Sequence, residues 1–189
     1  LPTGYRLQWS GQHEFMQRAR HKMLLVVPAT LFLILLLLYF NFRSVAESLI
    51  VMLSLPFALV GGVLLMALLG YNWSVASAIG FIALAGVSTE FGVIMLLYLN
   101  RAWQTRIDAG QNSGQDLLAA IREGAVQRVR PKAMTVAVIV AGLLPLFWGS
   151  GTGSEIMTRI AAPMIGGMIT APLLSLFVIP TVYHLLRRR

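Results

Sequence analysis

Cysteine does not occur among the 189 residues, and only 12% of them are charged. Without cysteine the chain has no disulfide, no thiolate metal site and no thiol nucleophile. The charged fraction is about half of the roughly 25% that is typical of soluble domains. Charges are nearly missing from several stretches that reach the roughly 20 apolar residues needed to cross a bilayer. These features predict a protein that crosses the membrane several times.

The sequence patterns of enzymes and ATP-driven pumps are missing as well. The chain has no glycine-rich phosphate loop with its lysine, and no nucleophile–histidine–acid set. Its three histidines do not have metal-ligand spacing. We therefore expect no enzyme, no bound cofactor and no ATP-driven step within this segment.

The net charge of +8 does not indicate nucleic-acid binding, because the basic residues gather at the ends of apolar runs. Such residues orient membrane helices and meet anionic headgroups. The expected partner of this charge is the lipid bilayer, and we expect no nucleic acid.

An all-α membrane fold with five transmembrane helices is the predicted fold class. Residues 1–22 are expected to be the end of a periplasmic domain, with a short strand at 5–9 and a lead-in helix from residue 14. Residues 23–189 form the expected transmembrane domain. Its spans are predicted at residues 23–40, 48–69, 74–99, 132–148 and 156–186. Because the chain opens on Leu1 with no apolar leader, we expect it to begin inside a longer protein.

A polar stretch joins the third and fourth predicted spans. Ser113 followed by Asp116 matches a capping box. We therefore predict a separate cytoplasmic helix over residues 115–129, lying at the membrane surface. Pro131 suits the first turn of the helix that follows.

The distribution of lysine and arginine predicts the topology. The connections after the first and third spans and the C-terminal tail together hold ten of these residues, and the other two loops hold none. This places the C-terminus in the cytoplasm and the N-terminus in the periplasm. Arg18, Arg20 and Lys22 go against the rule, but translocated domains often ignore it.

Glu90 is the unusual residue of the third span, because it lies about 24 Å from the start of that span at 1.5 Å per residue. A carboxylate at such depth costs about 3 kcal/mol on insertion scales. Two interpretations are open. Glu90 is a proton-carrying relay group, or it is a polar contact that holds two helices together.

Lys132 is the natural partner for Glu90, because its flexible stem reaches from the start of the fourth span towards a buried carboxylate. The alternative is an ordinary interfacial lysine that extends to the cytoplasmic headgroups. A lysine beside an acid whose charge depends on one proton is a plausible two-state switch.

Methionine is the other unusual feature, with nine residues. Met157, Met164 and Met168 follow an i, i+7, i+11 spacing that puts them on one helix face. Thioethers select soft ions such as Cu(I). Methionine is equally an adaptable packing residue, so the pattern alone does not choose between metal binding and packing.

Several stretches resemble the resistance-nodulation-division transporters, and within them the copper/silver permeases of the heavy-metal efflux branch. The most specific are GFIALAGVSTEFGVIMLLYL, RVRPKAMTVAVIVAGLLPLFWGSGTGSEIM and RIAAPMIGGMITAPLLSLFVIP. The resemblance covers essentially the whole chain and implies that its helices are spans eight to twelve of twelve.

The resemblance also implies a function. It implies a homotrimeric antiporter in the bacterial inner membrane that exchanges protons for Cu⁺ or Ag⁺. Its implied partners are a periplasmic adaptor and an outer-membrane channel. Glu90 matches the relay carboxylate and Lys132 the relay lysine. Met157 matches a methionine of the metal-shuttle pairs, and Met164 and Met168 are weaker candidates.

Two alternatives stay open. A pump for divalent zinc, cobalt or cadmium belongs to the same class, and the methionine face argues against it. A non-transporting membrane scaffold, in which Glu90 only fixes helix assembly, belongs to a different class. The relay aspartate of the fourth span and the periplasmic methionine cluster of the resembled family have no counterpart in this sequence, so we do not expect this segment to transport ions alone.

Overall fold

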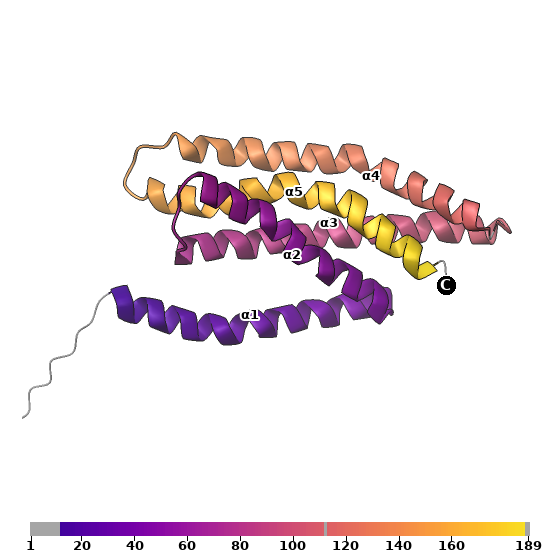
Figure 1. Cartoon of the computed structure of the whole chain (residues 1–189), viewed down its shortest axis with the longest axis horizontal. Helices are drawn as coiled ribbons and strands as arrows, with labels where there is room; N and C mark the ends of the chain where they lie inside the picture. The colour runs from indigo at the N-terminus through magenta and orange to yellow at the C-terminus, as the bar shows by residue number, and fades with distance from the viewer. Residues whose placement is uncertain (1–11, 112, 188–189) are drawn as a thin grey trace, which may run out of the picture.

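Five long helices make up the computed structural model, which describes residues 12–111 and 113–187 (Figure 1). No strand occurs in these ranges. The α-helices run in alternating directions. In chain order they are α1 (Gln12–Phe42), α2 (Val45–Leu68), α3 (Val75–Asp108), α4 (Gly114–Leu143) and α5 (Ser154–Arg187). A 3₁₀ turn, η1 (Leu144–Phe147), continues α4.

All five α-helices of the described residues are long and apolar enough to span a membrane, which confirms the predicted number of spans. The helices are longer than the predicted spans. The first begins at Gln12, so the lead-in helix and the span are one element, and α3 runs nine residues past the predicted end at Leu99. The strand predicted at residues 5–9 lies outside the described residues.

The prediction of a separate surface helix over residues 115–129 is wrong. α4 is continuous through Pro131, although its capping box of Ser113 and Asp116 forms as predicted. The reason is tertiary packing. The apolar side of this segment, including Leu117, Ala120 and Ile121, is buried against the extension of α3 around Trp103. The segment therefore packs on α3 as part of a helical hairpin.

The hairpin of α3 and α4 extends beyond the other helices, past the C-terminus (Figure 1). The 34 residues of α3 span about 51 Å at 1.5 Å per residue, against about 30 Å of hydrocarbon. An ion pair between Arg106 and Glu123, with 3.1 Å between nitrogen and oxygen, joins the two helices near the tip.

The core lies around α5, which packs against α2, α3 and α4. It approaches α2 so closely that a Cβ on Gly166 would collide with the carbonyl oxygen of Gly61. Small residues that let helix backbones approach are typical of membrane helix interfaces. Thr170 Oγ1 also donates a hydrogen bond across this interface to the carbonyl oxygen of Ala58, at 3.2 Å.

The first helix is peripheral. α1 contacts α2 and, more weakly, α3, and most of its apolar side chains are exposed. Leu24 and Leu25, for example, are 67% and 74% exposed. The outer face of α1 is therefore suited to hydrocarbon, not to water.

Candidate functional site

Lys132 is the only buried lysine of the described residues, at 2% exposure. Its Nζ donates a hydrogen bond of 2.6 Å to Ser175 Oγ on α5 and lies 5.5 Å from the centre of the Phe91 ring on α3. The Ser175 hydroxyl donates in turn to the carbonyl oxygen of Pro172, at 2.9 Å, so its lone pairs are free to accept from the lysine. Lys132 thus links α4 to both neighbouring helices.

The interfacial interpretation of Lys132 does not hold in this structure. The residue lies well inside α4, which begins 18 residues earlier at Gly114, and its side chain points into the bundle. The sequence predicts Lys132 at the start of a span, because Pro131 suits the first turn of a helix. Because α4 continues through Pro131, Lys132 lies inside the helix, and its ammonium is level with Phe91, the residue next to Glu90.

Glu90 is exposed on α3. It lies in a stripe of outward-facing residues with Val75, Ile79, Ile82 and Gly86, spaced three or four positions apart. A Cβ on Gly86 would meet nothing within 4 Å. This face of α3 is therefore uncovered within the described residues, and the Glu90 carboxylate follows the apolar residues along it.

The structure does not pair Glu90 with Lys132, which corrects the expectation that they are direct partners. Among residues 12–111 and 113–187, no hydrogen bond or ion pair uses the Glu90 carboxylate. The reason is helical geometry: successive residues are about 100° apart, so Phe91 faces the lysine while Glu90 faces outwards. The two charged groups flank Phe91 on different sides.

The three methionines do not form one exposed face. Met157 is 53% exposed near the start of α5, Met164 is half-buried, and Met168 is fully buried in the core beside Leu84. Their angular spacing is as predicted, but other helices cover only the later turns of α5. Met157 is the accessible thioether of the three, and Met168 is a packing residue.

A polar cluster of Glu47, Asn100, Tyr183 and Arg187 was missed by the sequence reasoning. Glu47 accepts from Asn100 Nδ2 at 2.8 Å and forms a 3.0 Å ion pair with Arg187, while the Tyr183 hydroxyl donates to Asn100 Oδ1 at 2.7 Å. The cluster joins α2, α3 and α5 at the end of the bundle where the chain ends. One signal was available: Ser44 caps α2 three residues before Glu47, which is the spacing of a capping motif.

Comparison with known proteins gives the family. Residues 1–187 match the family described as AcrB/AcrD/AcrF. The chain belongs to this family. The matched range takes in all five helices, including α3 with Glu90 and α4 with Lys132.

Within the AcrB/AcrD/AcrF family, two of the similar proteins are named for cation efflux and for metal resistance. The cation efflux system protein CusA of Escherichia coli (strain K12) is 58% identical, with 98% of this chain and 18% of the relative covered. The cobalt-zinc-cadmium resistance protein CzcA of Cupriavidus metallidurans is 35% identical, with 100% of this chain and 17% of the relative covered. Identity to the CusA protein is thus higher by 23 percentage points.

A solved structure supports the arrangement of the helices. The X-ray crystal structure of a heavy metal efflux pump, crystal form II, superposes with a TM-score of 0.82 at 32% identity. It covers 100% of this chain and 18% of the pump chain. The chain therefore spans about a fifth of the length of the relatives it matches.

Proposed function

We propose that the chain is part of a proton-driven inner-membrane permease that exports Cu⁺ or Ag⁺. The observation that carries the proposal is Glu90, an acid with no partner among the described residues, in an apolar stripe and next in sequence to Phe91, whose ring lies beside the buried Lys132. Such a carboxylate is tolerated inside a membrane when it is protonated or matched by another charge. A change between these two states is what a proton-driven pump requires.

Protonation of Glu90 would be coupled to the rest of the permease at the uncovered stripe of α3. We propose that the stripe packs against further helices of the full-length protein and that these supply the second carboxylate of the relay. When Glu90 takes up a proton it loses its charge, and its attraction for Lys132 and for any neighbouring cation falls. Lys132 is bonded to α5 through Ser175, so a movement of its ammonium would be passed to that helix.

The metal preference rests on the likeness to the CusA protein and on Met157. An exposed thioether suits a soft monovalent ion better than a hard divalent one. We propose Met157 as a contact on the export route, with Met164 and Met168 as weaker candidates, because Met168 is enclosed. A divalent-cation pump is the second candidate, supported by the likeness to the cobalt-zinc-cadmium protein.

The assembly and topology belong to the same proposal. We propose a homotrimer that works with a periplasmic adaptor and an outer-membrane channel, with the α2–α3 and α4–α5 loops in the periplasm. The α3–α4 connection and the C-terminus lie at the opposite end of the bundle (Figure 1). That end carries the basic connections, which favours the cytoplasm.

The test is Glu90→Gln in the full-length permease, expressed in cells that depend on it for silver resistance. Gln keeps the shape of the side chain but cannot gain or lose the proton, so we expect resistance to be lost at an unchanged membrane level of the protein. The matched control is Glu123→Gln on the exposed hairpin, where resistance should persist. Full resistance in the Glu90 variant would rule out the relay role and favour a structural one.

A resistance profile across metals separates the two pump candidates. Cells carrying the wild-type permease should gain resistance to silver and copper and little to zinc, cobalt or cadmium. Protection against the divalent ions alone would replace the first candidate with the second.

A further inference from the structure

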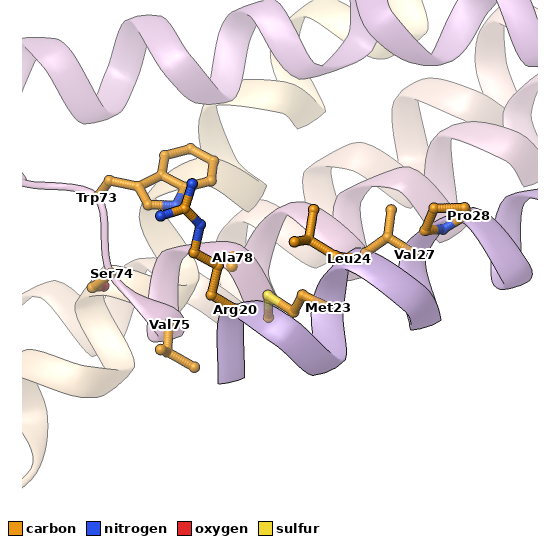
Figure 2. A pocket seen from close by; sticks show the side chains of 9 residues that line it. All are labelled: Arg20, Met23, Leu24, Val27, Pro28, Trp73, Ser74, Val75 and Ala78. Atoms are coloured by element: carbon orange, nitrogen blue, oxygen red, sulfur yellow. The ribbon is translucent and has the colours of Figure 1, made fainter. Parts of the chain in front are cut away.

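A cavity of about 510 Å³ opens between residues 20–28 of α1 and residues 73–78, where the turn after α2 leads into α3 (Figure 2). Its lining is mostly apolar and includes Met23, Leu24 and Val27 of α1 and Ala78 of α3. The volume lies within the range of about 300–1,000 Å³ that is usual for small-molecule sites. α1 makes few contacts with α3, which leaves room for the cavity.

One charged side chain lines this cavity, that of Arg20. Figure 2 shows the guanidinium extending from α1 towards the Trp73 ring. Arg20 is exposed, and in the described part of the chain no hydrogen bond or ion pair engages its guanidinium. A cation that is free to bind an anion therefore lies directly beside an apolar hollow.

The position along the bundle matches that of lipid headgroups. Arg20 is the first residue of the apolar span of α1, and Trp73 lies in the turn at the same end of the bundle. Tryptophan and arginine at the ends of spans sit at headgroup level. Below Arg20 the exposed leucines of α1 lie where acyl chains surround the protein.

We propose that this cavity binds a phospholipid, with the phosphate on the Arg20 guanidinium and an acyl chain along Leu24 and Val27. The guanidinium presents a planar fork of donors that matches a phosphate group. The apolar lining accepts a hydrocarbon chain, and besides Arg20 its polar side-chain groups are the Ser74 hydroxyl and the Trp73 indole N–H. The complementarity of charge at one end and hydrocarbon at the other selects a lipid over a soluble anion or a purely apolar molecule.

A bound lipid would have a structural consequence, because it would fill the gap that direct packing leaves between α1 and α3. The inference does not depend on the direction of transport or on the metal. It can fail while the proposed function stands, and the reverse also holds.

The test uses the purified full-length permease, titrated with phosphatidylglycerol and measured by native mass spectrometry. Arg20→Gln removes the cation, and Val27→Trp fills the cavity from the peripheral helix. We expect each variant to bind this lipid about fivefold more weakly than wild type. The matched control is Arg159→Gln, since Arg159 lies at the same end of the bundle but packs over the Tyr71 ring at 5.6 Å and does not line the cavity.

The proposal would be overturned by wild-type lipid affinity in Arg20→Gln, by wild-type affinity in Val27→Trp, or by an equal loss in Arg159→Gln. Glycerophosphoglycerol, the headgroup without acyl chains, serves as competitor. It should not displace the lipid at equimolar concentration. Displacement would show a simple anion site and would also overturn the proposal.

Discussion

Lys132 illustrates how much a buried cation depends on a single neighbour. Its ammonium has three donors, and Ser175 Oγ is the one hydrogen-bond acceptor that the described residues offer it. The Phe91 ring adds an attraction through its π-face. In the proposed relay, Ser175 is a positioning residue that holds the lysine from α5.

Ser175→Ala tests this role in the full-length permease. A hydrogen bond to a charged group is worth about 1.5–3 kcal/mol, so we expect silver transport into proteoliposomes to fall roughly tenfold or more. Ser175→Thr keeps the hydroxyl and should retain most of the activity. The pH profile of transport should shift in the alanine variant. A uniform loss at every pH would instead point to a packing defect.

The polar cluster of Glu47, Asn100, Tyr183 and Arg187 is a stabilising feature with a clear test. The side chain of Glu47 is 12% exposed and has two partners. Glu47→Ala leaves Asn100 Nδ2 without its acceptor and Arg187 with only a 3.4 Å hydrogen bond to Asn100 Oδ1. We expect the free energy of unfolding in detergent to fall by about 1–3 kcal/mol.

The control for the polar cluster is Glu123→Ala, which removes the exposed ion pair with Arg106. Exposed pairs contribute about 0–1 kcal/mol, so this variant should unfold close to the wild-type temperature. Equal losses in the two variants would mean that burial of Glu47 adds nothing.

At the scale of elements, the contact of α2 with α5 depends on glycine. A Cβ on Gly166 would run into the backbone of Gly61, which cannot move aside without separating the two helices. We expect Gly166→Ala to lower the free energy of unfolding by about 1–3 kcal/mol, as overpacking does elsewhere. Thermal unfolding of the purified permease measures the effect.

Gly114→Ala is the matched control for this interface. Nothing lies within 4 Å of a Cβ at Gly114, in the first turn of α4, and alanine is the better helix former by about 0.5–1 kcal/mol. This variant should be as stable as wild type or slightly more so. Destabilisation of similar size at both positions would refute the close-packing argument.

α4 shows why element boundaries are hard to read from sequence. Pro131 interrupts one backbone hydrogen bond, and the sequence offers a polar stretch on one side and an apolar run on the other. The helix nevertheless continues, because residues on both sides of Pro131 pack against α3. A proline inside a membrane helix is tolerated when neighbouring helices support it.

At the scale of the whole molecule, the proposed topology can be tested with introduced cysteines, since the chain has none of its own. Thr152→Cys lies in the α4–α5 loop and Gln111→Cys at the opposite end of the bundle. In a cysteine-free full-length permease, a membrane-impermeant maleimide should label Thr152→Cys in intact spheroplasts. It should label Gln111→Cys only after lysis, and the reverse pattern would invert the topology.

The sequence alone determined the number of membrane helices, because each apolar run must be long enough to cross the hydrocarbon and to satisfy its backbone within one helix. It also singled out Glu90 and Lys132, because charges inside such runs are costly and therefore conspicuous. The resemblance of the surrounding stretches to a transporter family is the basis of the proposed function.

The tertiary structure decided which partners these residues have. Lys132 meets Ser175, 43 residues further along the chain, Glu90 faces away from both, and Met168 is enclosed while Met157 is not. Helical periodicity fixes the angle at which a side chain leaves its own helix, but the neighbour at that angle depends on how the other helices pack. Burial and pairing are relations between distant segments, and these relations are settled only when the whole bundle has formed.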